Sequence, residues 1–464
     1  MAEGERGPGS VEGFADVPAF VRGLSFEHLP DEVVASAQRS LLDLIGVAAA
    51  GSRTKAAAIA STYAARQLCG SDYSARILFD GRRSGLAGAA FAGASTIDAL
   101  DGHDGHVLTK GHVGVAILPA LLALVDAAGP GEAPSAGAGR EFLTGLVLGY
   151  EIATRAGIAL HATVPDYHCS GAWNALGCAA VAARHFALDA ATTRHALGIA
   201  EYFGPRGQIL RACDSPTMVK DGSGWGAQVG LAATLLARDG FTGAPALTVE
   251  RDDAQAFWVD LGTRWRIGEQ YFKAYPVCRW AQPAIEAALD LQHRHRFAAD
   301  DIATIAIGSF REAVALGSQC ATPRTTEEAQ YSIAFPVAAA LVFGRVGAGE
   351  VDVRGLSEAR VQRLLPAVTL FEDAGFSRCF PAERWARVHV TLADGRSFVS
   401  EPARARGNPE NPLHEDELRA KYRELATPVL GAERAAGIER AVGALAAGDD
   451  ALPALLALLL SSAG

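Results

Sequence analysis

The sequence predicts a mainly α-helical protein with an α+β part: a large all-helical domain formed by both chain ends, and a smaller α+β domain inserted between them. Apolar residues recur at helical spacing up to about residue 270 and again from Glu415 onward, whereas strand-like alternation is confined to the stretch between. A chain of 464 residues is also too long for one ordinary core. We therefore expect a helical domain over 1–271, an α+β domain over 272–402, and the rest of the helical domain over 403–464.

The first long helix is predicted at residues 29–51. Its apolar residues recur at steps of three and four, and Asp31 and Glu32 lie in the first turn, where the helix dipole favours acidic groups. Helices of the same kind are predicted at 140–160, 191–203 and 224–241, the last with Gly240 at its C-terminal cap. Their faces are rich in Ala and Gly, which favours close packing of one helix on another.

Two stretches after residue 270 alternate as strands do. One is 299–310; the other, 386–400, consists of two runs joined through Asp394-Gly395, a strong hairpin signal. The intervening segments 325–344 and 357–371 have helical patterns, so this part of the chain is predicted to be α+β. Helix returns at 416–430, 432–448 and 452–460.

Composition excludes several classes of protein. The formal net charge is −10 and no basic block is present, so a nucleic-acid partner is not expected. The apolar, uncharged stretch at residues 111–125 contains Pro119 and is shorter than the roughly 20 apolar residues that cross a bilayer. The first ten residues lack the features of a signal peptide. We predict a soluble, cytoplasmic protein with no membrane partner.

The seven cysteines are scattered and form no C-x-x-C pair. This usage is typical of free thiols in a reducing compartment, and it provides no spacing for a zinc ribbon or an iron–sulfur cluster.

The stretch DALDGHDGHVLTKGHVG, residues 98–114, holds three of the chain's twelve histidines beside Asp101 and Asp104, within an otherwise apolar region. One interpretation is a solvated polar loop that caps the following helix. A second is a metal site, because His and Asp ligate zinc and iron and the His103-Asp104 pair resembles that of metal-dependent phosphohydrolases. A third is general acid–base chemistry, with a carboxylate that fixes the tautomer of a histidine.

Several segments, taken in order, resemble one family. The segment DALDGHDGH…GHVGVAILPALLAL resembles the LDFDDTH…GHPS…LPALLAL signature of the MmgE/PrpD family. The resemblance continues through YHCSGAWNALGCAAVAARHFALD, KDGSGWGAQVGLAATLLARDGFTGAPALTVE, YFKAYPVCRWAQPAIEAALDL, TTEEAQYSIAFPVAAAL and GNPENPLHEDELRAKYREL, and so covers nearly the whole chain. The family includes 2-methylcitrate dehydratase, cis-aconitate decarboxylase and iminodisuccinate epimerase. The resemblance implies a helical domain with an α+β lid, no metal or organic cofactor, and a homodimer.

The resemblance also implies catalytic roles. His112 matches the histidine of the family's GHPS motif, and His168 matches the histidine before the GxxG helix start, which suggests an acid–base pair. Asp101 matches the first aspartate of the DFDDT motif and is expected to orient a partner or to act as a base. Lys273 matches the lysine of FKxYPxC and is expected to hold a substrate carboxylate.

Further residues are expected to bind the substrate. Lys220 lies one position from the family's lysine before the glycine-rich stretch, and Gly105 replaces the family threonine, which removes a hydroxyl. The residues expected to bind substrate are His103, Asp104, His106, Lys220, Arg279 and Tyr331.

The expected activity is a cofactor-independent lyase that transfers a proton at carbon next to a carboxylate of a small di- or tricarboxylic acid, with donors placed where negative charge accumulates. Dehydration is expected ahead of decarboxylation. An epimerase of the iminodisuccinate type is an alternative within the family. A metal-dependent hydrolase built on His103, Asp104 and His106 is the alternative from another class, and a non-enzymatic member, suggested by Gly105, is a third.

Overall fold

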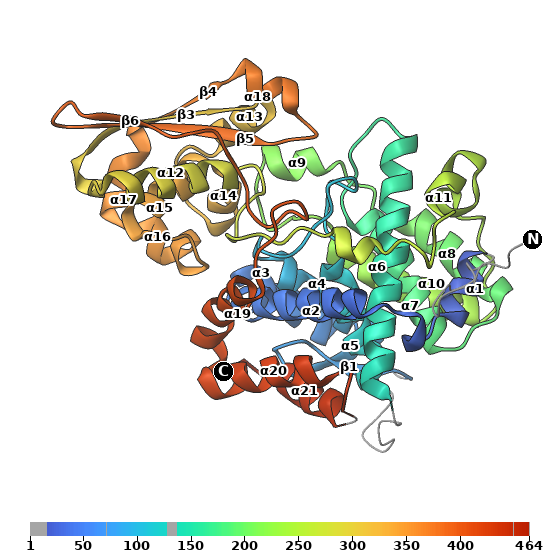
Figure 1. Ribbon diagram of the computed structural model, residues 1–464. Coiled ribbons are helices and arrows are strands. Elements are labelled where there is room, and N and C mark those ends of the chain that lie inside the picture. The colour runs from blue at the N-terminus through green and yellow to red at the C-terminus, as the bar shows by residue number, and fades with distance from the viewer. Residues whose placement is uncertain (1–15, 71, 128–136, 449, 464) are drawn as a thin grey trace, which may run out of the picture.

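Helices dominate the fold, as their spacing in the sequence predicts. The computed structural model describes residues 16–70, 72–127, 137–448 and 450–463, and within them the protein is mainly α-helical with two small sheets. Figure 1 shows two lobes: a large helical lobe, and a smaller one in which helices lie on one side of a sheet. The first ten residues lie outside the described residues.

The helical lobe begins with eleven described helices and a short hairpin. They are α1 (Val17–Gly23), α2 (Asp31–Gly51), α3 (Lys55–Gln67), β1 (Ser74–Arg76), β2 (Arg83–Gly85), α4 (Leu86–Asp98), α5 (Gly114–Ala127), α6 (Ala138–Thr163), α7 (Gly171–His185), α8 (Ala190–Phe203), α9 (Ile209–Asp214), α10 (Ser223–Arg238) and α11 (Leu247–Glu250). The predicted helices at 29–51, 140–160, 191–203 and 224–241 are confirmed as α2, α6, α8 and α10. Gly240, just beyond α10, has the left-handed φ of 95° that a C-terminal cap uses.

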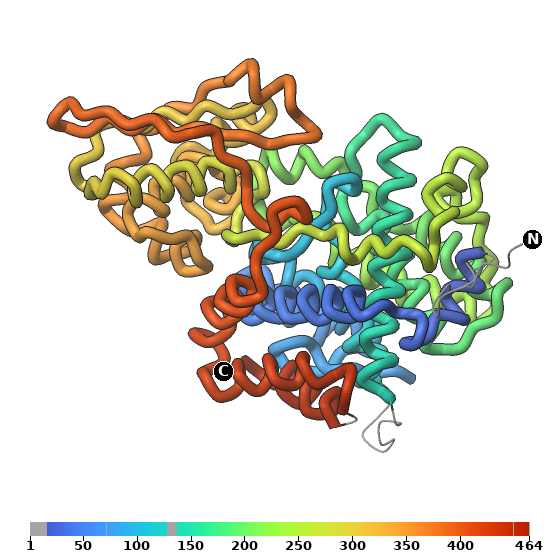
Figure 2. The backbone as a smooth tube through the Cα atoms, viewed as in Figure 1, coloured from blue at the N-terminus to red at the C-terminus, as the bar shows by residue number. Residues whose placement is uncertain are grey.

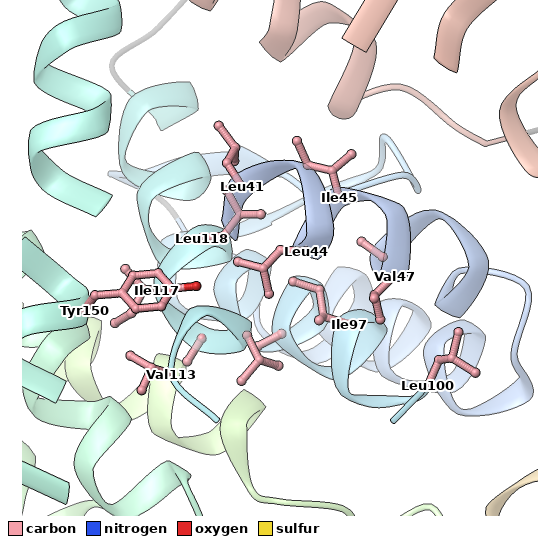
Figure 3. Close-up of a cluster of buried hydrophobic side chains, with 14 of the residues drawn as sticks. Leu41, Leu44, Ile45, Val47, Ile97, Leu100, Val113, Ile117, Leu118 and Tyr150 are labelled. Carbon is pink, nitrogen blue, oxygen red and sulfur yellow. The ribbon is translucent and has the colours of Figure 1, made fainter. Parts of the chain in front are cut away.

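The core of this lobe packs α2 against α4, α5 and α6. Figure 3 shows Leu44 of α2 pointing toward Ile97 of α4, while Leu41 projects from the other side of α2, and all three side chains are buried. Small residues bring the helices close together: a Cβ added to Gly177 of α7 would lie 2.8 Å from the carbonyl oxygen of Gly149 on α6. The Ala- and Gly-rich faces in the sequence therefore correspond to close backbone contact.

The smaller lobe holds a five-stranded sheet covered by helices. Its elements are α12 (Gln282–His295), β3 (Ile302–Ser309), α13 (Arg311–Gln319), α14 (Thr326–Tyr331), α15 (Ala334–Phe343), α16 (Val353–Ser357), α17 (Ala359–Leu364), β4 (Val368–Glu372), α18 (Ala374–Cys379), β5 (Trp385–Leu392), β6 (Ser397–Val399) and β7 (Ala403–Arg404). The strand order is β4-β3-β5-β6, with β7 also paired to β5; β3 and β4 run parallel, and the other pairs are antiparallel. The predicted strand at 299–310 and the hairpin at 386–400 are confirmed as β3 and as β5 with β6.

One predicted helix in this lobe is wrong in part. Residues 357–371 have a helical pattern, but the helix α17 ends at Leu364, and Val368–Glu372 form the strand β4. Pro366 cannot continue an α-helix, and β3 offers a parallel edge to which Val368 and Leu370 pair, opposite Ile305 and Ile307. Tertiary pairing decides the conformation of this segment. The segment at 325–344 is likewise two helices, α14 and α15, separated at Ser332 and Ile333.

The chain then returns to the helical lobe. Helices α19 (Glu415–Leu430), α20 (Ala432–Ala444) and α21 (Ala451–Leu459) follow, and α19 packs on α2 near the beginning of the chain. Figure 2 shows this last segment running down from the smaller lobe to lie beside the N-terminal helices. The outgoing and returning chains touch where they cross, because the Phe272 N–H donates to the Gly407 carbonyl at 2.9 Å.

Two helices, α2 and α6, are long and apolar enough to cross a membrane by length and composition. The fold buries 83% of the most apolar window of α2 and 100% of that of α6. Both are therefore central helices of the core.

Candidate active site

A cavity of about 110 Å³ lies where the two lobes meet. A water needs roughly 10–15 Å³ of such space, so the cavity has room for a small ligand of about ten non-hydrogen atoms. Its polar lining comes from the loop between α4 and α5, the segment before α10, and the crossing segment before α12. The smaller lobe adds an apolar wall that includes Trp280, Leu316 and Phe380.

His112 presents one ring nitrogen to this cavity. Its Nδ1 lies 2.5 Å from the Asp104 carbonyl oxygen, and because a carbonyl only accepts, Nδ1 must donate and therefore carries the proton. The Nε2 atom makes no hydrogen bond to a described residue and lies 3.9 Å from Asp101 Oδ1. Burial, together with the Lys273 ammonium, lowers the pKa of His112 well below its usual value. At neutral pH His112 is a neutral imidazole with a free acceptor nitrogen.

Asp101 and Lys273 form a buried ion pair beside His112. The Lys273 Nζ contacts Asp101 Oδ1 and also lies 3.2 Å from the Asp101 carbonyl oxygen. Burial alone would raise the pKa of Asp101, but the Lys273 ammonium, together with the neighbouring imidazoles and Lys220, holds that pKa well below the usual range. Burial alone would lower the pKa of Lys273, but Asp101 and the other acidic groups around it raise that pKa. Both groups therefore stay charged, although their positions are 172 residues apart in sequence.

Gln330 of α14 holds this pair and Lys220 in one arrangement. Its side-chain carbonyl accepts from the Asp101 N–H at 2.8 Å and from the Lys220 Nζ at 2.9 Å. Lys220 also lies 5.1 Å from the centre of the Tyr331 ring. Burial lowers the pKa of Lys220, and the nearby Asp101 and Asp98 oppose this. The smaller lobe thus directly contacts the loop between α4 and α5, which belongs to the helical lobe.

Arg279 is a buried cation without a carboxylate partner among the described residues. Its guanidinium lies 4.6 Å from the centre of the Tyr271 ring and donates to neutral oxygens, such as the Arg406 carbonyl at 2.9 Å. Burial lowers the pKa of Arg279 to about 10, so it stays charged at neutral pH. Its position at the cavity wall leaves its charge available to an anion.

The cavity is positive although the chain as a whole is acidic. Its cationic side chains are Lys110, Lys220, Lys273, Arg279 and Arg384, and its carboxyl groups are Asp98, Asp101 and Asp221. Burial and the neighbouring Asp98 raise the pKa of Asp221 to about 8, so that carboxyl group is mostly protonated at neutral pH. An anionic ligand of small size fits this balance of charge.

A second layer of polar groups supports His112 from behind. The Ser170 hydroxyl donates to Asp221 and accepts from the His112 N–H at 2.8 Å, and the Asp221 N–H donates to Asp98 at 3.3 Å. His103 lies against the His112 ring at 4.3 Å, edge to face, with its Nε2 3.4 Å from Asp98 Oδ1. His103 is therefore behind the cavity rather than in its lining.

Asp104 is also behind the cavity. Its Oδ2 accepts from the Tyr150 hydroxyl, its Oδ1 has no hydrogen-bond partner among the described residues, and burial raises its pKa to about 7. His106 does line the cavity, and its Nε2 contacts Glu269 Oε2 at 3.1 Å. These three side chains face different partners, and the described residues contain no group of three or more His, Cys, Asp or Glu side chains placed to hold a metal ion.

His168 lies at the edge of the cavity and outside its lining. Its Nδ1 is 3.3 Å from the Arg206 carbonyl oxygen, and its ring stacks on that of His161 at 6.4 Å. The neighbouring Tyr167 and Ile209 do line the cavity. Of the residues expected to act or bind, the structure gathers His112, Asp101, Lys273, Lys220, Arg279, Tyr331 and His106 at the cavity; it leaves His103 and Asp104 behind it and His168 at its edge.

Several site residues were not singled out in the sequence. Asp221, Gln330 and Tyr271 lie next to, or two residues from, Lys220, Tyr331 and Lys273 in the segments that resemble the family, so proximity to those motifs could have marked them. Lys110 lies two residues from His112 and could have been marked in the same way, whereas Arg384 belongs to no such motif and only the fold brings it to the cavity.

Comparison with protein families gives two matches that together span most of the chain. Residues 15–262 match the MmgE/PrpD N-terminal domain, and residues 275–446 match the MmgE/PrpD C-terminal domain. The gap between the two matches contains Tyr271 and Lys273 of the crossing segment.

Curated relatives are similar over different lengths. A cis-aconitate decarboxylase-like protein of Aspergillus oryzae is 26% identical over 96% of this chain and 96% of its own length. The cis-aconitate decarboxylase of Mus musculus is 25% identical over 90% of this chain and 87% of its own. The 2-methylcitrate dehydratase of Cupriavidus necator is 31% identical over 26% of this chain and 27% of its own.

Proposed function

The chain belongs to the MmgE/PrpD family, and from that premise we propose that it is a cofactor-independent hydro-lyase acting on a small di- or tricarboxylic acid. The observation that carries the proposal is a neutral imidazole, His112, whose free Nε2 faces a cavity lined by cations. A base next to positive charge suits removal of a proton from the carbon beside a carboxylate.

In the proposed reaction, His112 Nε2 takes the proton from that carbon. The electron pair of the broken C–H bond moves onto the adjacent carboxylate, where Lys273 and Arg279 stabilise the added negative charge. The pair then returns to form a C=C bond as hydroxide leaves the neighbouring carbon, and a proton donor converts the hydroxide to water. His168, at the cavity edge, is proposed as that donor. Its ring lies outside the cavity lining, so it must turn inward when substrate binds; the neighbouring Tyr167 already lines the cavity.

Asp101 is proposed as a positioning residue rather than the base. The Lys273 ammonium lowers the pKa of Asp101, against the opposing effect of burial, which makes this carboxylate a weak proton acceptor. Its ion pair fixes the Lys273 ammonium at the cavity wall, where it meets the substrate carboxylate.

Decarboxylation is a second candidate, favoured by the names of the relatives that are similar over most of the chain, a cis-aconitate decarboxylase-like protein and a cis-aconitate decarboxylase. Loss of carbon dioxide leaves a carbanion that must be given a proton, and an imidazole that is neutral at pH 7 is poorly suited to give one. The protonation state of His112 therefore favours dehydration.

A substrate panel separates the reactions. Hydroxy and unsaturated polycarboxylates are incubated with the protein, and three signals are followed: ultraviolet absorbance of a new C=C bond, release of carbon dioxide, and change in optical rotation. The proposal predicts a new C=C bond without carbon dioxide. Release of carbon dioxide would identify a decarboxylase instead of a hydro-lyase, and a change in optical rotation alone would identify an epimerase. Loss of activity on treatment with a chelator would contradict cofactor independence.

A further inference from the structure

Gly105 and Tyr271 are paired across the cavity wall. The Gly105 N–H donates to the Tyr271 carbonyl at 3.0 Å, and the Tyr271 N–H donates to the Gly105 carbonyl at 2.7 Å. In an antiparallel pair that exchanges both hydrogen bonds, the two residues project to the same side of the backbone. The Tyr271 ring is thereby held where residue 105 would carry its side chain.

The space beside Gly105 is already filled by two functional groups. A Cβ added to Gly105 would lie 2.5 Å from the Tyr271 hydroxyl oxygen, 2.6 Å from Tyr271 Cζ and 2.8 Å from His112 Nδ1. Real Cβ contacts are not this short, so any side chain at 105 would displace the phenol or the imidazole. Glycine at 105 is what allows the two rings to stand together.

The Tyr271 hydroxyl has no hydrogen-bond partner in the part of the chain that the structure describes. Tyr271 lines the cavity, and its hydroxyl makes no hydrogen bond to a described residue, while Arg279 holds the ring from the opposite side, 4.6 Å from its centre. Burial raises the pKa of Tyr271 although Lys273 and Arg279 oppose this, so the phenol keeps its proton at neutral pH. It is a positioned hydrogen-bond donor on a residue that lines the cavity.

We propose that Tyr271 is a substrate-binding residue whose hydroxyl donates to the carboxylate beside the reacting carbon, in the place that a threonine side chain at 105 would otherwise occupy. The inference rests on the proposed function, because the acceptor is that substrate's carboxylate. The loss of a hydroxyl at Gly105 is then compensated by a hydroxyl from a segment 166 residues further along the chain. A phenol reaches further than a threonine, so this exchange also reshapes the cavity and selects the substrate.

The test measures binding rather than turnover. Tricarballylate carries three carboxylates but neither a hydroxyl group nor a C=C bond, so it can occupy the cavity without reacting, and its Kd is measured by calorimetry. Tyr271→Phe keeps the ring against Arg279 and removes only the hydroxyl, and we expect binding to weaken roughly tenfold to hundredfold. Gly105→Ala should also weaken binding, because the ring must move away.

Two matched variants control for nonspecific effects. Tyr275→Phe removes a hydroxyl four residues along, outside the cavity lining, and Gly268→Ala adds a Cβ that meets nothing within 4 Å. Both should bind tricarballylate as the parent does. If the parent binds it and Tyr271→Phe or Gly105→Ala binds it equally well, the inference is wrong while the proposed function stands. If the parent binds no tricarballylate and converts no polycarboxylate, both are wrong.

Discussion

At the scale of single residues, the hydrogen bond from His112 Nδ1 to the Asp104 carbonyl determines which nitrogen can accept a proton. Ser170 fixes the same residue through its main-chain N–H, and the His103 ring fixes it through an edge-to-face contact. The ring cannot rotate without breaking these contacts, so its free Nε2 keeps one direction. Preorganisation of this kind is what a positioned base requires.

His112→Ala should lower kcat by roughly 10²–10⁴, the usual contribution of a positioned acid or base, with a smaller effect on KM. The measurement is steady-state kinetics on the substrate found in the panel. His106→Ala is the comparison: its ring lines the cavity but is held by Glu269, so its loss should appear mainly in KM. Near-normal turnover by His112→Ala would remove it as the base.

His168→Ala tests the proposed proton donor in the same assay. We expect a loss of kcat in the same range, since a leaving hydroxide needs a proton. A loss well below tenfold would show that His168 stays at the cavity edge, and the donor would then have to be sought among the lining residues, with Lys220 first.

Asp104 predicts a pH dependence of stability. Burial raises its pKa to about 7, so the folded state holds a proton that the unfolded state, with a pKa near 3.9, has lost. That contribution to stability is complete below the unfolded pKa and is lost as pH rises through about 7. Between pH 5 and 7, where the unfolded state has lost this proton and the folded state still holds it, the free energy of unfolding should fall by about 2 kcal/mol, and Asp104→Asn should flatten the decline.

The same measurement separates Asp104 from its neighbour. Asp221, with a pKa raised to about 8, contributes in the same direction over this range and on to about pH 8, so the Asn variant should retain part of the decline. A decline identical in the parent and in Asp104→Asn, measured by chemical denaturation across this window, would contradict the assignment.

At the scale of elements, α14 is the contact through which the smaller lobe reaches the site. Gln330 on this short helix binds the Asp101 N–H, Lys220 and, through its side-chain NH₂, the Ala99 carbonyl at 3.3 Å. Its own carbonyl accepts from the Cys278 N–H at 2.8 Å. The helix thus contacts the loop between α4 and α5, the segment before α10 and the crossing segment before α12.

Gln330→Leu should remove the side-chain hydrogen bonds through which α14 holds the Asp101 N–H and Lys220. We expect the free energy of unfolding to fall by about 1–3 kcal/mol, because buried donors and an acceptor lose their partner, and KM to rise because Lys220 is no longer held. Gln292→Leu is the matched control: Gln292 on α12 donates to the Leu341 carbonyl at 2.9 Å, away from the cavity. It should lose stability without a change in KM. A KM change of equal size in both variants would show that α14 has no special role.

At the scale of the whole molecule, the two lobes are joined by chain crossings that touch at Phe272 and Gly407, and Lys273 follows at once. The cavity lies at this junction, so a movement of one lobe changes the distance between the cations of the two sides. Cytoplasmic location and the homodimer remain predictions at this scale.

Exposed apolar side chains on α8, on α10 and in the segment before α10 are candidates for the contact surface of the predicted homodimer. Tyr202 and Phe203 at the end of α8 are 76% and 58% exposed, Val219 is 70% exposed, and Trp225 on α10 is 50% exposed. Trp225→Glu should convert a dimer to a monomer in sedimentation velocity. Phe371→Glu, at a 49% exposed residue of β4, should leave the dimer intact. A monomeric parent protein would contradict the prediction.

The helices of the large lobe, the hairpin of the smaller one and most of the candidate active-site residues could be predicted from the sequence. Those features depend on periodicity and on short motifs, which are local. Asp31 and Glu32 lie in the first turn of α2, and Asp394-Gly395 forms the turn between β5 and β6, as the local sequence predicts. His112, Asp101 and Lys273 could be named because their motifs are short and contiguous.

The strand β4 and the position of each candidate residue relative to the cavity could not be predicted, because they depend on which distant segments of the chain come into contact. Val368–Glu372 is a strand because β3 provides its partner, and His103 and Asp104 lie behind the cavity, where they contact His112 and Tyr150. In the sequence, Gly105 only indicates that the hydroxyl of the family threonine is lost. In the fold, Gly105 pairs with Tyr271, whose hydroxyl lies beside it. Long-range pairing leaves no periodic trace in a single sequence, and for that reason the residues that complete the site could be found only in the folded chain.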